Sequence, residues 1–242
     1  MNETHDQMGS IKLVQSPSGV KASVDGVLLA RFVRPGAHWN VADLGCGNGL
    51  VGLLMARDQP QARFLGVEIQ DVLIRQALAG SRASGLTNIR FVRADLQAPP
   101  WSRRLERFDL VVANPPYRKV GTGRLSPDPV RAAARHEILA DAGVFARAAA
   151  SLLRDGSSSA WIYLAERHEA LRDAVRQAGM EPVRFRYVKS RGDLAPVLVL
   201  LEAVKGGDVG MLLEEEPLVL YEGKKGRQYT EEAREMIYGV EP

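Results

Sequence analysis

Short apolar runs alternate with longer amphipathic stretches through the middle of the chain. The apolar runs cover residues 41–44, 64–68, 89–94 and 108–113, and polar or turn-forming residues bound each of them. Runs of this length are typical of strands that are buried in a parallel sheet. Apolar residues recur at helical spacing over 50–57 and 70–84. Strands that alternate with helices in this way predict an α/β fold.

The pattern extends on both sides of this region. A short helix over 25–32 precedes the first strand, and residues 214–217 are expected to form a loop. After the fourth strand the remaining predicted elements are a helical stretch over 132–153, a strand over 160–164, a helix over 166–178, two antiparallel strands over 182–189 and 197–203, a short strand over 218–221 and a helix over 230–238 capped by Thr230.

These elements predict one Rossmann-like domain over residues 15–242, preceded by a flexible lead over residues 1–14. We expect its sheet to have seven strands, mostly parallel, with helices on both faces. The chain of 242 residues is long enough to bury a sizeable core in one such domain.

Bulk composition excludes several classes of protein. Hydrophobic residues make up 45% of the chain and charged residues 25%, as in ordinary globular proteins. The apolar runs are too short to span a bilayer, and the polar first ten residues do not resemble a signal peptide. The single cysteine, Cys46, excludes an internal disulfide, and the His and Cys residues show no metal-ligand spacing. We therefore expect a cytoplasmic protein without membrane or metal contacts; the sequence does not fix its oligomeric state.

The segment Asn114-Pro115-Pro116-Tyr117 follows the apolar run at 108–113. Two prolines lack N–H groups and restrict the residues before them, so they stop the strand and prevent a helix from starting. A rigid turn is therefore expected at the sheet edge where open α/β sheets bind ligands. Such a turn offers an Asn amide, unpaired backbone carbonyls and an aromatic ring, the groups that can hold a planar NH₂ group while it is methylated.

A glycine-rich turn comes after the first strand. Its residues are Gly45, Cys46, Gly47, Asn48 and Gly49, and Asp43 lies on the strand just before them. Glycines permit positive φ and let a ligand approach the backbone closely. The G-x-G-x-G spacing and the preceding acid favour S-adenosylmethionine over a dinucleotide, because Asp43 would repel a pyrophosphate and attract a cationic methionine group. Cys46 is interpreted as a small filler of this turn.

Two further strand ends carry acids. Glu68, next to Ile69, stands about 20 residues after the glycine turn, at the position that binds ribose hydroxyls. Asp95, next to Leu96, is suited to accept a hydrogen bond from an adenine amino group. Each feature is ambiguous alone, but their order on four consecutive strands indicates a class I methyltransferase fold that uses S-adenosylmethionine and releases S-adenosylhomocysteine.

Basic residues are unevenly distributed, although the net charge is only +3. Clusters of this kind beside a catalytic edge can bind the phosphate backbone of a nucleic acid; the alternative is that they form a basic face that only solvent contacts. The three clusters are Arg118, Lys119, Arg124, Arg131 and Arg135; Arg184, Arg186, Lys189 and Arg191; and Lys224, Lys225 and Arg227.

The chain resembles the bacterial tRNA(Val) adenine N6-methyltransferases, which modify the adenine beside the anticodon. The resemblance spans most of the chain and is carried by four stretches. They are Gln15-Ser16-Pro17 with Asp25-Gly26-Val27-Leu28-Leu29; the glycine turn at 45–49; Asn114-Pro115-Pro116-Tyr117 with Ala134-Arg135-His136-Glu137; and Pro217-Leu218-Val219-Leu220-Tyr221 with Tyr229-Thr230. It implies a tRNA anticodon loop as partner, with the target adenine held by Asn114 and Pro115 and stacked on Tyr117.

Other substrates remain open at this point. Methyltransferases that act on a glutamine of release factors share the Asn-Pro-Pro-Tyr segment, because a planar amide presents the same geometric problem as adenine. A base amine of ribosomal RNA is another candidate, although those enzymes usually have Phe where Tyr117 stands. DNA adenine methylation and a cofactor-binding scaffold without catalysis are less consistent with the residues.

Overall fold

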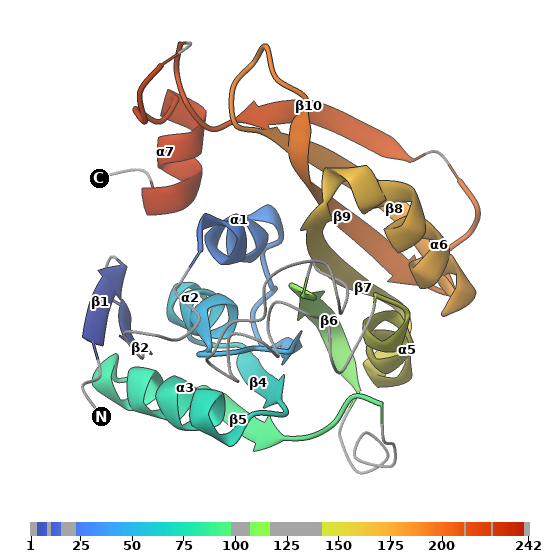
Figure 1. Ribbon diagram of the computed structural model, residues 1–242. Coiled ribbons are helices and arrows are strands. Elements are labelled where there is room, and N and C mark those ends of the chain that lie inside the picture. Colours follow the sequence, from blue (N-terminus) through green and yellow to red (C-terminus); the bar gives the residue numbers. More distant parts are fainter. Residues whose placement is uncertain are drawn as a thin grey trace, which may run out of the picture.

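The computed structural model describes residues 4–8, 11–15, 23–97, 107–116, 142–210, 212–223 and 225–239. Eight of the described strands form one sheet, in the order β10-β8-β9-β7-β6-β3-β4-β5 (Figure 1). Their bounds are β3 Asn40–Leu44, β4 Arg63–Glu68, β5 Ile89–Arg93, β6 Phe108–Ala113, β7 Leu153–Leu164, β8 Met180–Lys189, β9 Pro196–Lys205 and β10 Leu213–Val219.

Most neighbours in this sheet run parallel, as the sequence predicted. The β3–β4, β4–β5, β3–β6, β6–β7 and β8–β10 pairs are parallel, whereas β9 is antiparallel to both β7 and β8. The expected antiparallel neighbours at 182–189 and 197–203 are therefore confirmed as β8 and β9. An α/β sheet with this strand order is a Rossmann-like methyltransferase fold.

The sheet contains eight of the described strands and not the expected seven, because the short strand predicted over 218–221 also joins it as β10, which begins at Leu213. We expected a loop at 214–217, since three glutamates and Pro217 have low strand propensity. The segment nevertheless pairs with β8, with a register shift between Glu215 and Leu218. Leu218 is fully buried. Burial and pairing therefore override the local propensity.

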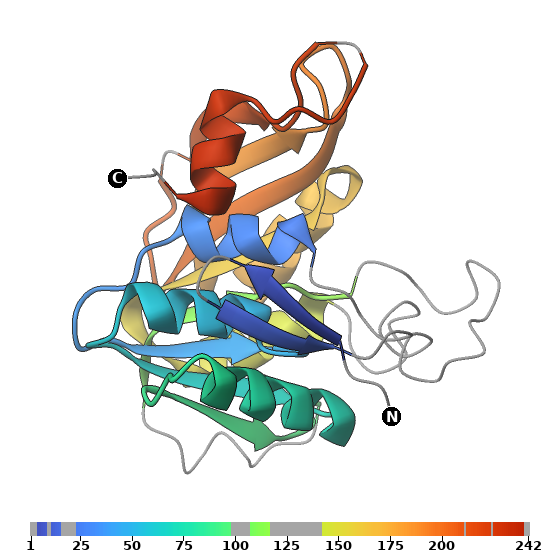
Figure 2. The same cartoon turned by 90° about the vertical axis from the view of Figure 1, so that its left-hand side faces the viewer.

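Helices cover both faces of the sheet (Figures 1 and 2). One core lies between the sheet and α1, α2 and α7, and a second core lies between its other face and α5 and α6. α3 contacts β5 and α2. The bounds are α1 Val24–Phe32, α2 Leu50–Asp58, α3 Asp71–Ala83, α5 Ala142–Leu152, α6 His168–Gln177 and α7 Glu231–Tyr238.

Several helix predictions are confirmed. The helices expected over 25–32, 50–57, 70–84 and 230–238 match α1, α2, α3 and α7 closely. Thr230 caps α7, because its hydroxyl accepts a hydrogen bond from Ala233 N at 3.2 Å. The first part of the helical stretch predicted over 132–153 lies outside the described residues, and its last residue, Leu153, begins β7.

The expected loose lead is not what the structure shows for residues 4–8 and 11–15. These form an antiparallel pair, β1 Thr4–Met8 and β2 Ile11–Gln15, and β2 packs against α3 (Figure 1). Ile11 and Leu13 are fully buried, and Lys12 N donates to Ser84 Oγ at 2.9 Å. A two-stranded ribbon needs such a surface to be stable, and short sequence patterns do not reveal it. The division into a lead and one domain stays a prediction.

His168 is buried at the start of α6. A 3₁₀ turn, η2 Ala165–Arg167, precedes it and shifts the start of the helix by two residues from the predicted 166. Its Nδ1 lies 2.8 Å from the hydroxyl of Tyr187, and its ring lies 4.6 Å from that of Phe185. The strand β8 supplies both partners, so only the tertiary structure could reveal this burial.

Candidate active site

Four strands bring the predicted site residues to one edge of the sheet. Leu44 of β3 pairs with Val67 of β4 and with Ala113 of β6. The residues that follow, Gly45, Glu68 and Asn114, therefore leave the sheet side by side. This carboxyl edge is where open parallel sheets bind their ligands.

The glycine turn has a backbone that only glycine adopts easily. Gly45, Gly47 and Gly49 have φ values of +65°, +57° and +88°. A Cβ atom added at Gly45 would lie 2.9 Å from Phe145, whereas one added at Gly47 would meet nothing within 4 Å. Positive φ therefore accounts for all three glycines, and the Gly47 backbone faces open space that a ligand could fill.

Backbone hydrogen bonds fix the turn between β3 and α2. Cys46 N donates to Val67 O at 3.0 Å, and Gly49 N donates to Cys46 O at 2.9 Å. The Cys46 side chain is buried, and this burial raises the pKa of its thiol well above the ordinary value. The role of a small, unreactive filler predicted for Cys46 agrees with these properties.

Asn48 supplies an unsatisfied donor beside these glycines. Its side chain is 6% exposed, and its Nδ2 finds no hydrogen-bond partner in the structure. A buried amide in this state costs about 1–3 kcal/mol, and native proteins rarely keep one without a reason. A ligand with an acceptor group, such as the carboxylate of a methionine moiety, would satisfy it. The turn therefore fits the predicted cofactor.

Asp43 lies on β3, just before the turn, and its carboxylate forms a hydrogen bond with the first turn of α2. Its Oδ2 accepts a hydrogen bond from Gly52 N at 3.0 Å, and the side chain is 4% exposed. Burial is the largest influence and raises the pKa of Asp43, the Gly52 N–H lowers it, and the negative charge of Glu68 raises it, which together place it at about 7. The two acids therefore form a buried pair that a nearby positive charge would stabilise.

Glu68 ties the glycine turn to the end of β4. Its Oε1 accepts from Ile69 N and Gln70 N, both at 2.9 Å, and its Oε2 accepts from Gly47 N at 3.1 Å. Burial raises the pKa of Glu68, and the three N–H groups oppose that effect. A carboxylate can accept about four hydrogen bonds, and three are used here, so capacity remains for about one more, from a ribose hydroxyl. The structure reveals a clamp on the turn that the sequence did not suggest.

Asp95 and Asn114 flank this region, because they follow β5 and β6, the strands on either side of the β3–β4 pair. Asp95 is half-buried and accepts from Gln97 N at 2.8 Å, and Leu96 packs against the core on the α5–α6 face. Asn114 is half-buried and follows the fully buried Ala113, and Pro115 is buried. Tyr117, and the basic cluster from Arg118 to Arg135, lie outside the described residues.

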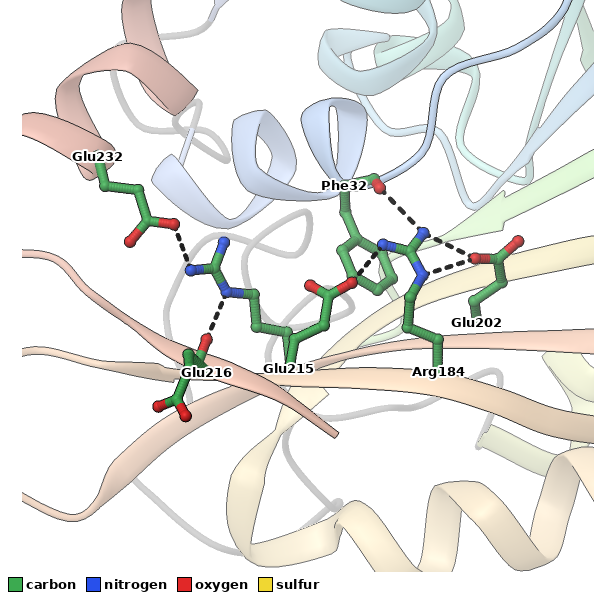
Figure 3. Close-up of polar contacts among 7 residues, drawn as sticks. Phe32, Arg184, Glu202, Glu215, Glu216 and Glu232 are labelled. Atoms are coloured by element: carbon green, nitrogen blue, oxygen red, sulfur yellow. Dashed lines mark hydrogen bonds and ion pairs between the residues drawn. The ribbon is translucent and has the colours of Figure 1, made fainter. Parts of the chain in front are cut away.

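Two arginines of the second basic cluster, Arg184 and Arg186, form ion pairs with glutamates of the protein itself (Figure 3). Arg184 forms ion pairs with Glu202 at 2.7 Å and with Glu215 at 2.8 Å. Its guanidinium also donates to Phe32 O at 3.3 Å and lies 4.2 Å from the centre of the Phe32 ring. Neither contact with a phosphate backbone nor a solvated basic face, the two alternatives for this cluster, describes Arg184, because the residue joins α1 to β8, β9 and β10.

Arg186 is used in the same way. It forms an ion pair with Glu232 of α7, and its Nε donates to Glu216 O at 2.8 Å. These contacts attach the C-terminal segment to the sheet. Sequence reasoning missed them because each acid lies 30 or more residues away along the chain.

The described residues contain no group of three or more His, Cys, Asp or Glu side chains that could hold a metal ion. None of the described helices is long and apolar enough to cross a membrane.

The buried carboxyl of Asp43 predicts a pH dependence of stability. In the unfolded chain this group titrates near pH 3.9, and in the folded protein it titrates at about 7. Between these values the unfolded state loses a proton that the folded state keeps, so the free energy of unfolding falls as the pH rises. Asp43→Asn keeps an oxygen for Gly52 N but cannot ionise. Urea unfolding should show the variant gaining roughly 2–4 kcal/mol relative to wild type between about pH 4 and pH 7.

The exposed Asp208→Asn variant is the matched control and should keep a constant difference from wild type. A constant difference for Asp43→Asn as well would show that the buried carboxyl does not titrate in this range.

Comparisons with known proteins agree with this geometry. A family model described as a methyltransferase domain matches residues 36–173. A tRNA1(Val) (adenine(37)-N6)-methyltransferase of Porphyromonas gingivalis is 33% identical over 130 residues, which is 51% of this chain and 50% of that protein. The chain thus aligns with about half the length of this relative. A protein of the same name from Haemophilus influenzae is 27% identical over 219 residues, covering 90% of this chain and 89% of its own length.

Among solved structures, a predicted O-methyltransferase from Agrobacterium tumefaciens shares the fold. It has a TM-score of 0.69 and 20% sequence identity, and the match covers 89% of this chain and 96% of that one. At this identity the likeness supports the fold alone. The family model, the strand order and the glycine turn together show that the chain belongs to the class I S-adenosylmethionine-dependent methyltransferases.

Proposed function

We propose that this methyltransferase transfers a methyl group to the exocyclic N6 amine of an adenine in tRNA, beside the anticodon of tRNA(Val). The observation that carries the proposal is the position of the Asn114-Pro115-Pro116 turn. The pairing of Leu44 with Ala113 sets this turn directly beside the glycine turn. The names of the Porphyromonas and Haemophilus relatives, which are tRNA adenine N6-methyltransferases, support the substrate.

The cofactor side of the site is formed by the residues around the glycine turn. Asn48 Nδ2 is available for the carboxylate of the methionine group, and Glu68 for the ribose hydroxyls. Asp95 and the neighbouring Leu96 and Ile69 are proposed to contact the adenine part. S-adenosylmethionine bound there supplies a methyl group on a sulfonium, which is itself an excellent leaving group.

The acceptor side is formed by Asn114 and the two prolines. The N6 lone pair of adenine is delocalised into the ring, so the amine is a weak nucleophile. Hydrogen bonds from the amine to the Asn114 side-chain oxygen and the Pro115 carbonyl would draw the nitrogen toward tetrahedral geometry. The same two oxygens would stabilise the positive charge that develops on it, so positioning and electrostatics replace a strong base.

The prolines make this arrangement rigid. Pro115 and Pro116 have no N–H groups, and their rings fix their own φ angles and restrict the residues before them, so the backbone of the turn has few accessible conformations. Pro115 is also buried, which holds its carbonyl at a fixed place beside Asn114. A preorganised acceptor pair needs no rearrangement during the reaction.

Transfer of label from S-adenosylmethionine decides between the possible substrates. The protein is incubated with labelled cofactor and, separately, with total tRNA, ribosomal RNA and a release factor. We expect label in tRNA, recovered as N6-methyladenosine after digestion to nucleosides. Label found only in a glutamine of the release factor, or only in ribosomal RNA, would replace the proposed substrate with that one.

Glu68 should determine the affinity for the cofactor. Glu68→Ala removes the acceptor for the ribose hydroxyls and the clamp on Gly47 N. We expect S-adenosylmethionine to bind about 1.5–3 kcal/mol more weakly, as for the loss of hydrogen bonds to a charged group. Calorimetry measures the affinity, with the exposed Glu169→Ala as control. Equal affinities for wild type and Glu68→Ala would remove Glu68 from the cofactor site.

Asn114 should act on the chemical step. Asn114→Ala is expected to leave cofactor affinity nearly unchanged and to lower kcat by roughly 10²–10³-fold, because the lost hydrogen bond is strongest in the transition state. Asn114→Asp keeps an acceptor oxygen and should retain more activity than Asn114→Ala. Single-turnover assays with folded protein measure the rate. Near-normal turnover by Asn114→Ala would show that the residue only shapes the turn.

A further inference from the structure

The sheet brings a third basic cluster to the same edge as the Asn114 turn. β7 runs parallel to β6, β9 is antiparallel to β7, and β8 is antiparallel to β9, so β8 runs in the direction of β6. β10 is parallel to β8. The segments that follow β8 and β10 therefore begin at the edge where the methyl group is proposed to be transferred.

Two segments meet there, residues 189–193 after β8 and residues 221–229 after β10. Leu220 N donates to Lys189 O at 2.9 Å, and Tyr221 N donates to Ser190 O at 3.0 Å. These bonds continue the parallel pairing of β8 and β10 past the ends of the strands. We call the side chains of Lys189, Arg191, Lys225 and Arg227 on these segments the C-terminal basic surface.

The loop over 221–229 is closed by its own contacts. Tyr221 and Tyr229 form an isolated β-bridge, and their rings stack at 5.1 Å between centroids and 22° between planes. Glu222 N donates to Gln228 O at 2.9 Å. Tyr238 of α7 places its ring edge-on to Tyr229 at 6.1 Å. The described residues at the two ends of the loop are therefore held together.

Arg191 holds the tip of the loop from the neighbouring segment. Its Nη2 donates to Gly226 O at 2.6 Å, and its guanidinium carbon lies 5.9 Å from the centre of the Tyr221 ring. Gly226 lies between Lys225 and Arg227, so this bond fixes the backbone that carries both cations. Cations on a fixed backbone lose less entropy when they bind an anion.

The charges of this surface differ from those of Arg184 and Arg186. Lys225 and Arg227 are exposed, and neither forms an ion pair within the part of the chain that the structure describes. Across residues 189–193 and 221–229 the sequence has more basic than acidic residues, the acids being Asp193 and Glu222. Basic charge that the protein does not compensate itself is available for an external anion.

The spacing suits a polymer of phosphates. Three strand spacings separate β6 from β8 and four separate it from β10, which amounts to roughly 14–19 Å at about 4.8 Å each. The phosphates of one strand of a duplex are spaced about 3.4 Å apart when measured along the helix axis. A base at Asn114 and several phosphates on the C-terminal basic surface can therefore belong to one molecule.

The geometry points to the C-terminal basic surface as a second binding site for the phosphate backbone of the RNA whose adenine is methylated at Asn114. This inference rests on the proposed function. It gives the Tyr221–Tyr229 stack and Arg191 the role of a support that presents Lys225 and Arg227. The Arg184–Arg191 cluster contributes only its last members, because Arg184 and Arg186 are paired internally.

Neutralisation of the two exposed cations tests the inference. The variant Lys225→Gln/Arg227→Gln is compared with the control variant Arg63→Gln/Arg90→Gln. The two control side chains are also exposed, but they lie near the N-terminal ends of β4 and β5, at the edge of the sheet opposite the proposed site. Binding of a fluorescent tRNA that wild type methylates is measured by anisotropy over a range of salt concentrations. Two lost contacts should lower the slope of log affinity against log salt by about 1.4, at roughly 0.7 for each phosphate.

The control pair should keep the wild-type slope, and both variants should bind S-adenosylmethionine normally, which verifies their folding. The KM for tRNA should rise in Lys225→Gln/Arg227→Gln, with kcat at saturating tRNA unchanged. An unchanged slope and KM, while wild type methylates tRNA, would overturn the inference and leave the proposed function standing. Failure of the wild type to methylate any RNA would overturn both the proposed function and this inference. If Lys225→Gln/Arg227→Gln raises the KM only for a protein substrate, the C-terminal basic surface binds an acidic protein and not RNA.

Discussion

Three backbone N–H groups converge on the carboxylate of Glu68, and the shape of the site depends on this interaction. Two of them belong to the chain just after β4, and the third belongs to Gly47 in the turn after β3. The carboxylate thereby holds two strand ends at a fixed separation. A single acid can thus shape the turn and still keep acceptor capacity for a ligand.

The same arrangement gathers buried polar groups that are electrostatically unfavourable on their own. Asp43 and Glu68 are both buried, and each has a raised pKa because burial disfavours the charged form. Asn48 adds a buried amide without a partner. A cationic ligand with a carboxylate group relieves all three conditions at once. The residues that cost stability in the free protein are therefore the ones that we propose to favour binding of S-adenosylmethionine.

Arginine has two distinct roles at the C-terminal end of the sheet. Arg184 and Arg186 are surrounded by acids from β9, β10 and α7 and serve to join these elements. Arg191 binds a backbone carbonyl and lies against Tyr221, and Arg227 is exposed nearby. Residue type and position in the sequence do not distinguish these roles, since all four belong to basic clusters. The difference arises from which acids the fold brings within reach.

The sequence by itself determined the features that depend on neighbours along the chain. Apolar runs of strand length, the positive-φ glycines at 45, 47 and 49, the cap at Thr230 and the strand stop at Pro115 all follow from local sterics and hydrogen bonding. Parallel pairing then places the strand ends together, so much of the candidate site was predictable. The tertiary structure alone decided the rest. β10 forms in a segment of poor strand propensity because β8 offers a free edge, β1 and β2 pair because α3 covers them, and His168 is buried because Phe185 and Tyr187 surround it. These outcomes depend on contacts between residues far apart in the chain, which local patterns do not encode.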